Sequence, residues 1–465
     1  MSEQKSESAP NGLVKKYDRP GPRYTSYPTV PEWDDKYGHD EYTAALQAAS
    51  KDLNEPLSFY LHIPFCRRRC WFCGCNTLVA TSERSADEYI KRIRKESSMI
   101  SSILGERRNI SQFHWGGGTP SFLTDSQTVT VFEIFSKDYN ILRDAEISIE
   151  VDPRVTPKER IRLLKSLGFN RLSFGIQDFD RQVQQAIGRN QDEQMATELY
   201  QYCRREGYLG INFDLVYGLP AQSMETFGET LKKVIDLRPD RVALYSFAYL
   251  PAGKAHQKKI NVDLLPTAVT KFALFNLAKS RFIDGGYVQI GMDHFVLPND
   301  ELALAAARGK LRRNFMGYTV NAAKDWIGIG ASSISYINNN FVQNLNGIDS
   351  YAAAIDSGKF ATTKGLKLTT DDLIRQHVIS ELMCNFRLDL HDLKEKFRIN
   401  PEDYLAGELK ALAPFTGDGL LEILDGKITV TATGKTFVRN IAMVFDAYLN
   451  NPSASRSKVQ FSRTV

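Results

Sequence analysis

The stretch HIPFCRRRCWFCGCN concentrates the thiols of this chain. Four of the six cysteines fall within the ten residues from Cys66 to Cys75, with the spacing C-x3-C-x2-C-x-C, whereas Cys203 and Cys384 are isolated. Thiols this close together can form disulfides, bind zinc or hold an iron–sulfur cluster. Which of these applies decides the chemistry of the loop.

Disulfides and zinc fit this stretch poorly. The chain starts without an apolar leader and has no apolar run long enough to cross a membrane, so we expect a cytoplasmic protein without structural disulfides. Structural zinc usually takes two separated pairs of ligands, and no second cysteine pair or histidine pair follows this one. An iron–sulfur cluster is therefore the favoured prediction, because short cysteine loops hold such clusters.

Three of the four thiols suffice for such a site. Cys66, Cys70 and Cys73 can reach three corners of a 4Fe-4S cluster, which leaves the fourth iron open. The amino and carboxylate groups of S-adenosylmethionine would occupy that iron, and an electron from the cluster would release a deoxyadenosyl radical. Cys75 is separated from Cys73 by one glycine and is too close to reach a separate corner. We expect Cys75 to lie near a second cofactor or the substrate instead.

The motif CxxxCxxC after a strand resembles the radical S-adenosylmethionine superfamily. The longer stretch from Tyr60 to Asn76 resembles one family within it, the oxygen-independent coproporphyrinogen III oxidases. Further motifs of that family follow in order along nearly the whole chain: GPRYTSYPT (Gly21 to Thr29), HWGGGTP (His114 to Pro120), EISIEVDPR (Glu146 to Arg154), GIQDF (Gly175 to Phe179), DLVYGLP (Asp214 to Pro220), GMDHF (Gly291 to Phe295) and CNFRLD (Cys384 to Asp389).

The resemblance implies an oxidoreductase of haem biosynthesis. Two propionate side chains of coproporphyrinogen III would lose carbon dioxide without oxygen and become the vinyl groups of protoporphyrinogen IX. The reaction would use the 4Fe-4S cluster, two molecules of S-adenosylmethionine and an electron donor such as flavodoxin or ferredoxin. Two alternatives stay open, a related radical enzyme that degrades haem and a haem-binding chaperone. Cys75 and the Gly21–Thr29 motif argue against the chaperone.

The resemblance also assigns site residues. Contacts to the first S-adenosylmethionine are expected from Tyr60, Gly117, Glu150 and Ile334. Contacts to the second are expected from Phe72, Gly118, Thr119, Gln177, Arg189, Asp214 and Ala248. The catalytic set is Tyr60, Cys75, Glu150, Arg189 and Asp214. Independently of the family, glycines let a backbone approach a ligand closely, and opposite charges such as Arg189 and Asp214 can clamp carboxylate and amino groups.

Short β-branched or aromatic runs alternate with amphipathic helical stretches such as Ala86–Leu104 and Met224–Leu237, which predicts a parallel sheet. The strand candidates are Ser58–Ile63, Ser111–Trp115, Glu146–Val151, Arg171–Ile176, Gly210–Val216 and Val242–Phe247. Most of the site residues fall at or near the carboxyl ends of these strands, where active sites of α/β folds gather. The resemblance implies an incomplete (β/α)6 radical-SAM barrel, in an α/β fold with an N-terminal arm and a mostly helical C-terminal domain.

We expect three parts: an N-terminal arm and helix over the active site at 1–55, the barrel and its extension at 56–340, and a mostly helical, winged-helix-like domain at 341–465. In the arm, Arg23 is expected near a carboxylate. The last part ends in a hairpin, LLEILDGKITVTA, with Asp425-Gly426 as its turn. Residues 370–450 carry 13 Asp and Glu against 9 Lys and Arg, and this acidic balance disfavours nucleic-acid binding.

Charge elsewhere is moderate, with a net value of +4 that does not indicate a nucleic-acid partner. Arg67–Arg69 lie between the cysteines and either attract an acidic electron donor or form a solvated basic loop.

We expect a monomer. Asp293 and His294 stay outside the catalytic set, because an isolated histidine is more often structural. Met316 and Tyr249 stand where the family pattern has glutamine and histidine.

Overall fold

The computed structural model describes residues 12–320, 323–450 and 461–464. The chain forms two compact units, and each is assembled from separate stretches of sequence. One unit contains Asp34–Gly286 and Asn321–Lys367. The other contains Met1–Trp33, Tyr287–Val320 and Leu368–Val465.

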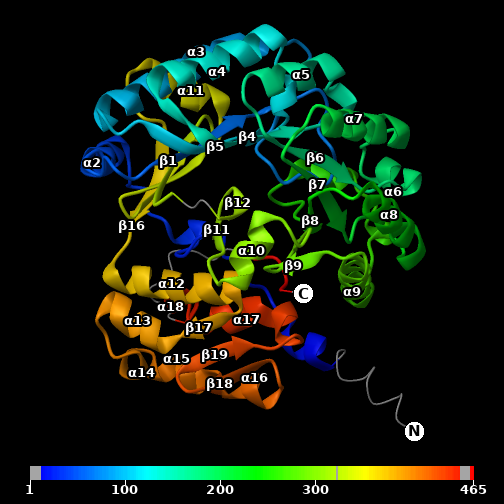
Figure 1. The fold of residues 1–465 in the computed structure, drawn as a ribbon, viewed down its shortest axis with the longest axis vertical. Coiled ribbons are helices and arrows are strands. Elements are labelled where there is room, and N and C mark those ends of the chain that lie inside the picture. The colour runs from blue at the N-terminus through cyan, green and yellow to red at the C-terminus, as the bar shows by residue number, and fades with distance from the viewer. Residues whose placement is uncertain (1–11, 321–322, 451–460, 465) are drawn as a thin grey trace. The chain divides into compact units, whose positions relative to one another are not determined.

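Six parallel strands of the first unit lie side by side in chain order: β1 (Leu57–Ile63), β4 (Asn109–Gly117), β5 (Asn140–Val151), β6 (Arg171–Gln177), β7 (Gly210–Tyr217) and β8 (Arg241–Ser246). All six strand predictions are confirmed, with ends that differ by a few residues. The helices that connect them lie on the outer side of the strands (Figure 1): α3 (Ser85–Leu104), α4 (Asp125–Asp138), α5 (Lys158–Ser166), α6 (Arg181–Ala186), α7 (Glu193–Arg205) and α8 (Met224–Leu237).

Aromatic side chains fill the space between these strands and helices. Phe113 on β4 lies with its ring centroid 4.4 Å from that of Phe135 on α4, and Phe213 on β7 lies 5.1 Å from Tyr200 on α7. The helices present one apolar side to the sheet, as at Ile93 and Ile100 of α3, which are fully buried. Burial of these side chains fixes the strands, and hence the loops at their carboxyl ends.

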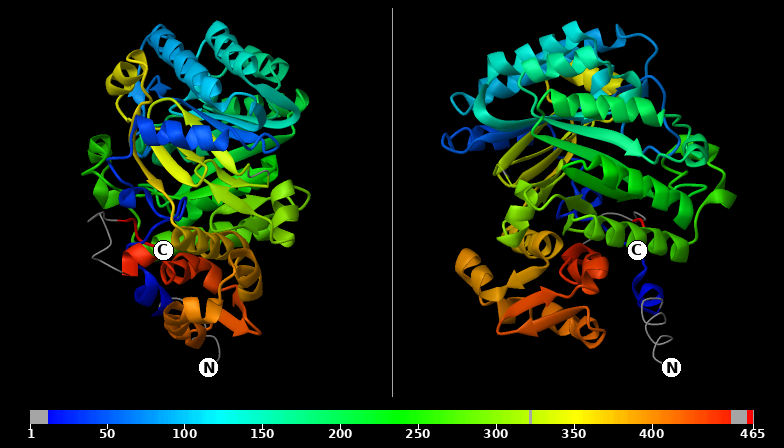
Figure 2. Two further views of the ribbon diagram at one scale, coloured as in Figure 1. Left: turned by 90° about the vertical axis from the view of Figure 1, so that its left-hand side faces the viewer. Right: turned by 45° about the vertical axis from the view of Figure 1, so that its right-hand side comes forward.

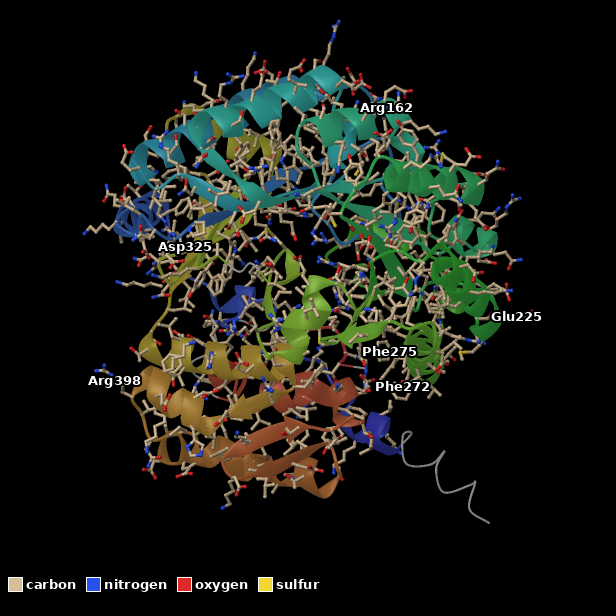
Figure 3. The ribbon with its side chains drawn as sticks, viewed as in Figure 1. Arg162, Glu225, Phe272, Phe275, Asp325 and Arg398 are labelled. Atoms are coloured by element: carbon tan, nitrogen blue, oxygen red, sulfur yellow. The ribbon has the colours of Figure 1, made fainter. Side chains whose placement is uncertain are left out.

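The sheet continues beyond β1 with strands that the sequence analysis did not predict. β13 (Asp325–Ile329) pairs with β1 in parallel, and β14 (Ile334–Ile337), β15 (Asn340–Asn344) and β16 (Thr362–Lys367) follow in antiparallel order (Figure 2, yellow). A buried ion pair anchors this extension: Arg107 Nη1 lies 2.7 Å from the carboxylate of Asp325, which Figure 3 labels. Removing one partner of such a pair costs about 3–5 kcal/mol.

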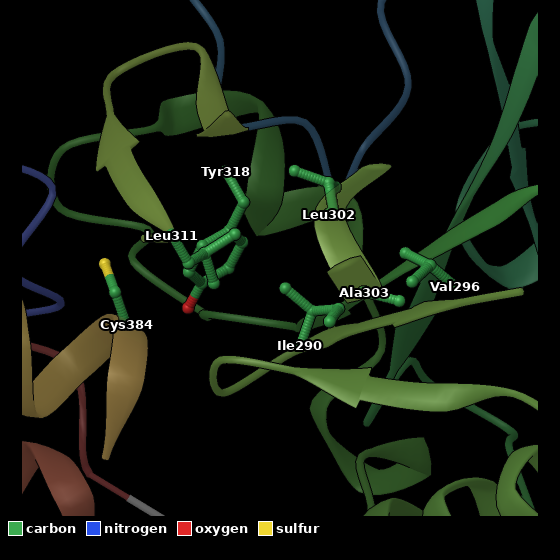
Figure 4. Packing of buried hydrophobic residues seen from close by; sticks show 7 residues of the cluster. All are labelled: Ile290, Val296, Leu302, Ala303, Leu311, Tyr318 and Cys384. Carbon is green, nitrogen blue, oxygen red and sulfur yellow. The ribbon is translucent and has the colours of Figure 1, made fainter. Parts of the chain in front are cut away.

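The second unit has its own core. β9 (Val288–Ile290), β10 (His294–Val296), α10 (Glu301–Ala307) and α12 (Thr370–Asn385) contribute to a buried cluster of Ile290, Val296, Leu302, Ala303, Leu311, Tyr318 and Cys384 (Figure 4). Cys384 is thus a core residue, and burial raises the pKa of its thiol to about 11. The expected hairpin is β18 (Leu421–Leu424) and β19 (Lys427–Val430). Asp425 and Gly426 have the positive φ of a tight hairpin turn.

The N-terminal arm packs on the end of the chain within this unit. Arg439 on α17 (Val438–Met443) donates from Nε to the Pro22 carbonyl at 2.9 Å. Tyr24 donates to Asp446 at 2.9 Å. The arm is therefore an ordered segment, and its predicted position over an active site stays a prediction. No helix among the residues that the structure describes is both long and apolar enough to cross a membrane.

Candidate functional site

The cysteine-rich segment, residues 66–76, is named the cluster loop here and lies between β2 (Phe65–Cys66) and β3 (Leu78–Val79). These two short strands pair in parallel, and the loop follows the carboxyl end of β1 after Pro64. The sequence-predicted placement past a barrel strand is therefore correct. Carboxyl ends of parallel strands are where α/β proteins build their sites.

The four thiols of the loop differ in environment. Cys66 and Cys70 are buried, Cys73 is half-buried and Cys75 is exposed. Burial raises the pKa of Cys66 to about 11. A hydrogen bond from the Cys75 thiol, together with the Cys75 backbone N–H, lowers the pKa of Cys73 to about 6. That same hydrogen bond raises the pKa of Cys75 well above its usual value. Cys73 therefore loses its proton more easily than Cys75 does.

Soft thiol donors suit an iron–sulfur cluster. Among the described residues, no three His, Cys, Asp or Glu side chains converge on a point where one metal ion would sit. A cluster spreads its ligands over several irons, so convergence on one point is not its requirement. The assignment of Cys66, Cys70 and Cys73 as ligands stays a prediction that the donor chemistry fits.

Two arginines point at Cys70. Arg154 Nη2 lies 3.8 Å and Arg189 Nη1 lies 3.7 Å from the Cys70 sulfur. Asp152, just past β5, accepts from both guanidinium groups at 2.7 and 3.3 Å. Burial acts to raise the pKa of the Asp152 carboxyl, but the two arginines outweigh it and hold that pKa below its usual range. Of these three residues only Arg189 has a predicted cofactor role.

The glycine run after β4 is packed so tightly that side chains are excluded. A Cβ on Gly117 would lie 2.6 Å from the Ile63 carbonyl oxygen, and one on Gly118 would lie 2.9 Å from the Cys66 sulfur. Gly117 also has a φ of +129°, which favours glycine. Thr119 follows, buried, with its hydroxyl 3.3 Å from the Cys66 sulfur. The run therefore brings backbone and hydroxyl directly against the first cysteine.

A hydrogen-bonded chain joins β1 to the end of the cluster loop. His62 Nε2 lies 3.0 Å from the Asn76 carbonyl oxygen. A carbonyl only accepts, so Nε2 carries the proton. Burial lowers the pKa of His62 and keeps the ring neutral, and Nδ1 then accepts from the Tyr60 hydroxyl at 3.0 Å. The Tyr60 oxygen keeps its lone pairs for a further donor.

Glu150, at the end of β5, faces the glycine run. Its carboxylate accepts from the Gly117 N–H at 3.2 Å and lies 3.7 Å from His114 Nε2. The side chain is 40% exposed, which leaves oxygen atoms accessible to a ligand. Tyr60 stacks on His114, with ring centroids 5.9 Å apart. Tyr60, Gly117 and Glu150, which the resemblance assigned to one cofactor, therefore lie in one group. Ile334, the fourth of that set, is on β14.

Three residues assigned to the second cofactor, Gln177, Arg189 and Asp214, come from β6, from the segment between α6 and α7, and from β7. Gln177 ends β6 with a φ of +68°, at an irregularity in its pairing with β7. Such backbone strain in a non-glycine residue concentrates at functional sites. Asp214 on β7 accepts from Ser173 and Asn212 at 2.9 and 2.8 Å. Arg189 is held at Cys70 and by the Gly175 carbonyl.

Phe72 and Ala248 are joined by a residue that the sequence analysis missed. Gln257, on the 3-10 helix η4 (Ala255–Lys259), donates from Nε2 to the carbonyls of Phe72 and Ala248 at 3.1 and 3.2 Å. Beside it, His256 Nε2 lies 2.7 Å from the Cys73 carbonyl. No motif marks these two residues, because the contact joins positions more than 180 residues apart.

The arginine triplet divides in two. Arg67 pairs with Glu83, and Arg69 donates to Thr77, which directly follows the cluster loop. Arg68 is exposed and forms no ion pair among the described residues. Asp293 and His294 bond to each other at 2.8 Å in the other unit, where Arg313 lies 4.0 Å from Asp293. The Arg23 carbonyl accepts from Arg313 at 2.8 Å.

The chain is similar to known proteins over nearly its whole length. The model of the radical SAM superfamily matches residues 60–234, and that of the HemN C-terminal domain matches residues 368–437. An oxygen-independent coproporphyrinogen III oxidase of Synechocystis sp. is 42% identical, with 97% of each chain covered. That of Escherichia coli is 41% identical, with 97% of this chain and 98% of the relative covered. This chain belongs to the oxygen-independent coproporphyrinogen III oxidase family.

A solved structure supports the predicted fold. The structure of coproporphyrinogen III oxidase (HemN) from Escherichia coli, described as a radical SAM enzyme, superposes with a TM-score of 0.90. It is 40% identical in sequence and covers 94% of this chain and 99% of its own. The predicted radical-SAM fold class is confirmed. The family binds a 4Fe-4S cluster and S-adenosylmethionine, and both cofactor predictions hold at that level.

Proposed function

We propose that this chain converts coproporphyrinogen III to protoporphyrinogen IX by anaerobic oxidative decarboxylation of two propionate side chains. The observation that carries this proposal is the coverage of the relatives of that name, 97% of the chain at 41–42% identity. The haem-degrading enzyme and the haem-binding chaperone find no support among these relatives.

The site residues support this activity as follows. Cys66, Cys70 and Cys73 hold the cluster, which together with S-adenosylmethionine supplies radical chemistry when bound. Glu150 offers accessible carboxylate oxygens, and Tyr60 offers a phenol oxygen whose own proton is committed to His62. These groups bind and orient one S-adenosylmethionine, with Gly117 and Ile334.

A second S-adenosylmethionine fits the reaction, because two propionates react. Its contacts are Phe72, Gly118, Thr119, Gln177, Arg189, Asp214 and Ala248. The strained backbone of Gln177 and the glycine run beside Cys66 support this assignment. Within the same proposal, an acidic electron donor such as flavodoxin or ferredoxin reduces the cluster. The division at residues 55 and 340, the monomeric state and the cytoplasmic location stay predictions.

The direct test is anaerobic incubation of reconstituted protein with coproporphyrinogen III, S-adenosylmethionine and a reductant, followed by porphyrin analysis. Protoporphyrinogen IX is expected, and no decarboxylated product from a cluster-loaded protein would refute the activity. The chaperone alternative predicts haem binding without product.

Cys75 separates cluster binding from the rest of the chemistry. Cys75→Ser is expected to keep its iron and its cluster spectrum while decarboxylation falls severely, since Cys75 is exposed and follows the ligand Cys73 too closely to be one itself. Cys73→Ser is the matched comparison and is expected to lose the cluster. Equal iron loss in both variants would make Cys75 a ligand, and full activity of Cys75→Ser would make it a packing residue.

A further inference from the structure

Gln257 is a buried amide whose side chain makes three hydrogen bonds to loop backbone. Its side chain is 1% exposed. The two N–H groups of Nε2 reach the carbonyls of Phe72 and Ala248, and Oε1 accepts from the Leu250 N–H at 2.6 Å. Carbonyls in a loop lack the inter-strand hydrogen bonds that strand carbonyls have. When they are buried, a side-chain amide can supply the missing donor.

His256 hydrogen-bonds the next carbonyl of the cluster loop, that of Cys73. Its Nε2 lies 2.7 Å from the Cys73 oxygen, and because a carbonyl only accepts, Nε2 donates. Two consecutive residues of η4 therefore hold two consecutive carbonyls of the loop. Inside the loop, the Cys73 N–H reaches only the Cys70 carbonyl, at 3.3 Å. The tighter bond at Cys73 thus comes from η4.

Apolar packing supports the same junction. Trp71 and Phe72 pack against a buried cluster of Val183, Ile187, Val216, Leu219, Phe247 and Ile260. Two of these, Phe247 and Ile260, flank η4 in sequence. The Trp71 N–H donates to the Ile187 carbonyl at 2.8 Å. The part of the cluster loop around Phe72 and Cys73 is therefore held partly by α6 and partly by side chains from the segment after β8.

We propose that Gln257 is a positioning residue for the cofactor site. It sets Phe72 and the adjoining Cys73 at a defined place relative to Ala248 by binding their backbone, and His256 assists at Cys73. The inference rests on the proposed function, in which Cys73 is a cluster ligand and Phe72 and Ala248 contact S-adenosylmethionine. Among the described residues, the Gln257 side chain hydrogen-bonds only to backbone.

The test is Gln257→Glu, which keeps the shape and the Oε1 acceptor but replaces both N–H donors with an oxygen that faces two carbonyls. Gln127→Glu on α4 is the matched control. Gln127 is 8% exposed, its Nε2 donates to the Glu83 carbonyl at 2.9 Å and to the Asp87 carboxylate at 2.6 Å, and its Oε1 accepts from the Thr124 N–H at 3.0 Å. It lies outside the cluster loop. Gln257→Met, which has similar length and no charge, serves if the glutamate variant fails to fold.

Two measurements on reconstituted holoprotein decide the matter. Iron release to a ferrous chelator is expected to be about tenfold faster in the Gln257 variant than in wild type, the factor that corresponds to loss of one buried hydrogen-bonded contact. S-adenosylmethionine binding is followed by the electron paramagnetic resonance signal of the reduced cluster. The half-saturating concentration of S-adenosylmethionine is expected to rise in the Gln257 variant. A residue that only stabilised the fold would lower the melting temperature without moving that concentration.

Wild-type iron release and wild-type response to S-adenosylmethionine in both Gln257 variants would overturn the proposal. Equal effects in Gln127→Glu would overturn it as well. Neither measurement needs coproporphyrinogen III. A wild-type protein that binds the cluster and S-adenosylmethionine but makes no protoporphyrinogen would refute the proposed function. The role of Gln257 could still be measured in that protein.

Discussion

At the residue scale, Cys70 lies among charges that no single motif reveals. Arg154 comes from the turn after β5, and Arg189 from the segment between α6 and α7, yet both reach its sulfur. Asp152 accepts from both and holds them in place. Hydrogen bonds to ligand sulfurs and local net charge are the protein's means of setting a cluster's reduction potential.

Arg154→Gln is expected to make the reduction potential of the cluster more negative. The added electron is stabilised by a cation beside the ligand sulfur, and the substitution removes that cation while Arg189 remains. An anaerobic redox titration followed by electron paramagnetic resonance measures the shift. Arg162→Gln, a change at a 65% exposed arginine on α5, is the control and should leave the potential unaltered. Equal potentials in all three proteins would assign Arg154 to holding Asp152 alone.

At the element scale, local pattern was enough for the barrel strands. β1 and β4 to β8 were recognisable from short runs of β-branched and aromatic residues. In β6 buried residues alternate with half-buried ones, as in a strand with one face packed against helices. Their order could be predicted because each pairs with the next strand along the chain. β13 pairs with β1 across a sequence separation of more than 260 residues, Leu57 opposite Asp325, and no local pattern carries such a pairing.

The candidate site was predictable to a similar extent. Motifs placed Cys66, Gly117 and Glu150 at strand ends, where the structure has them. Gln257 lies in no motif, and its importance comes from the backbone carbonyls that it hydrogen-bonds. Asp152 lies in the motif from Glu146 to Arg154, but the motif does not show that its carboxylate pairs with Arg189. Contacts of this kind become visible only in three dimensions.

Gly118→Ala tests how tightly two elements must approach at the first cysteine. The added methyl would lie 2.6 Å from the Pro64 carbonyl oxygen, so the segment between β1 and β2 must move away from the glycine run. We expect a loss of stability of about 1–3 kcal/mol, as for overpacking, and a clear fall in iron content. Urea unfolding and iron analysis after reconstitution measure the two effects.

The same substitution on a helix is the control. At Gly228 on α8 the nearest atom is Leu277 Cδ2, 4.0 Å away, so alanine fits. Gly228→Ala is expected to stabilise by about 0.5–1 kcal/mol, because glycine is a poor helix former. Normal iron content and stability in Gly118→Ala would mean that the glycine run yields without disturbing Cys66.

At the scale of the whole molecule, the net charge of +4 is too small to guide a partner by itself. Any steering of an electron donor must come from local charge near the cluster loop. Of the triplet there, Arg67 is paired with Glu83 and Arg69 is bound to Thr77. Neutralising all three would therefore disturb the loop as well as its charge. Arg68, exposed and outside any ion pair of the described residues, isolates the electrostatic contribution.

Arg68→Gln is expected to slow cluster reduction by an acidic protein donor about two- to fivefold at low salt, because electrostatic steering raises association rates. The difference should vanish at high salt, where charges are screened within about 3 Å at 1 M. Stopped-flow reduction by flavodoxin measures the rate. Dithionite reduction should be unchanged, since a small reductant does not dock. Arg143→Gln, an exposed arginine near the opposite end of β5, is the matched control. A salt-independent defect would indicate damage to the loop, and no defect would make Arg68 part of a solvated surface.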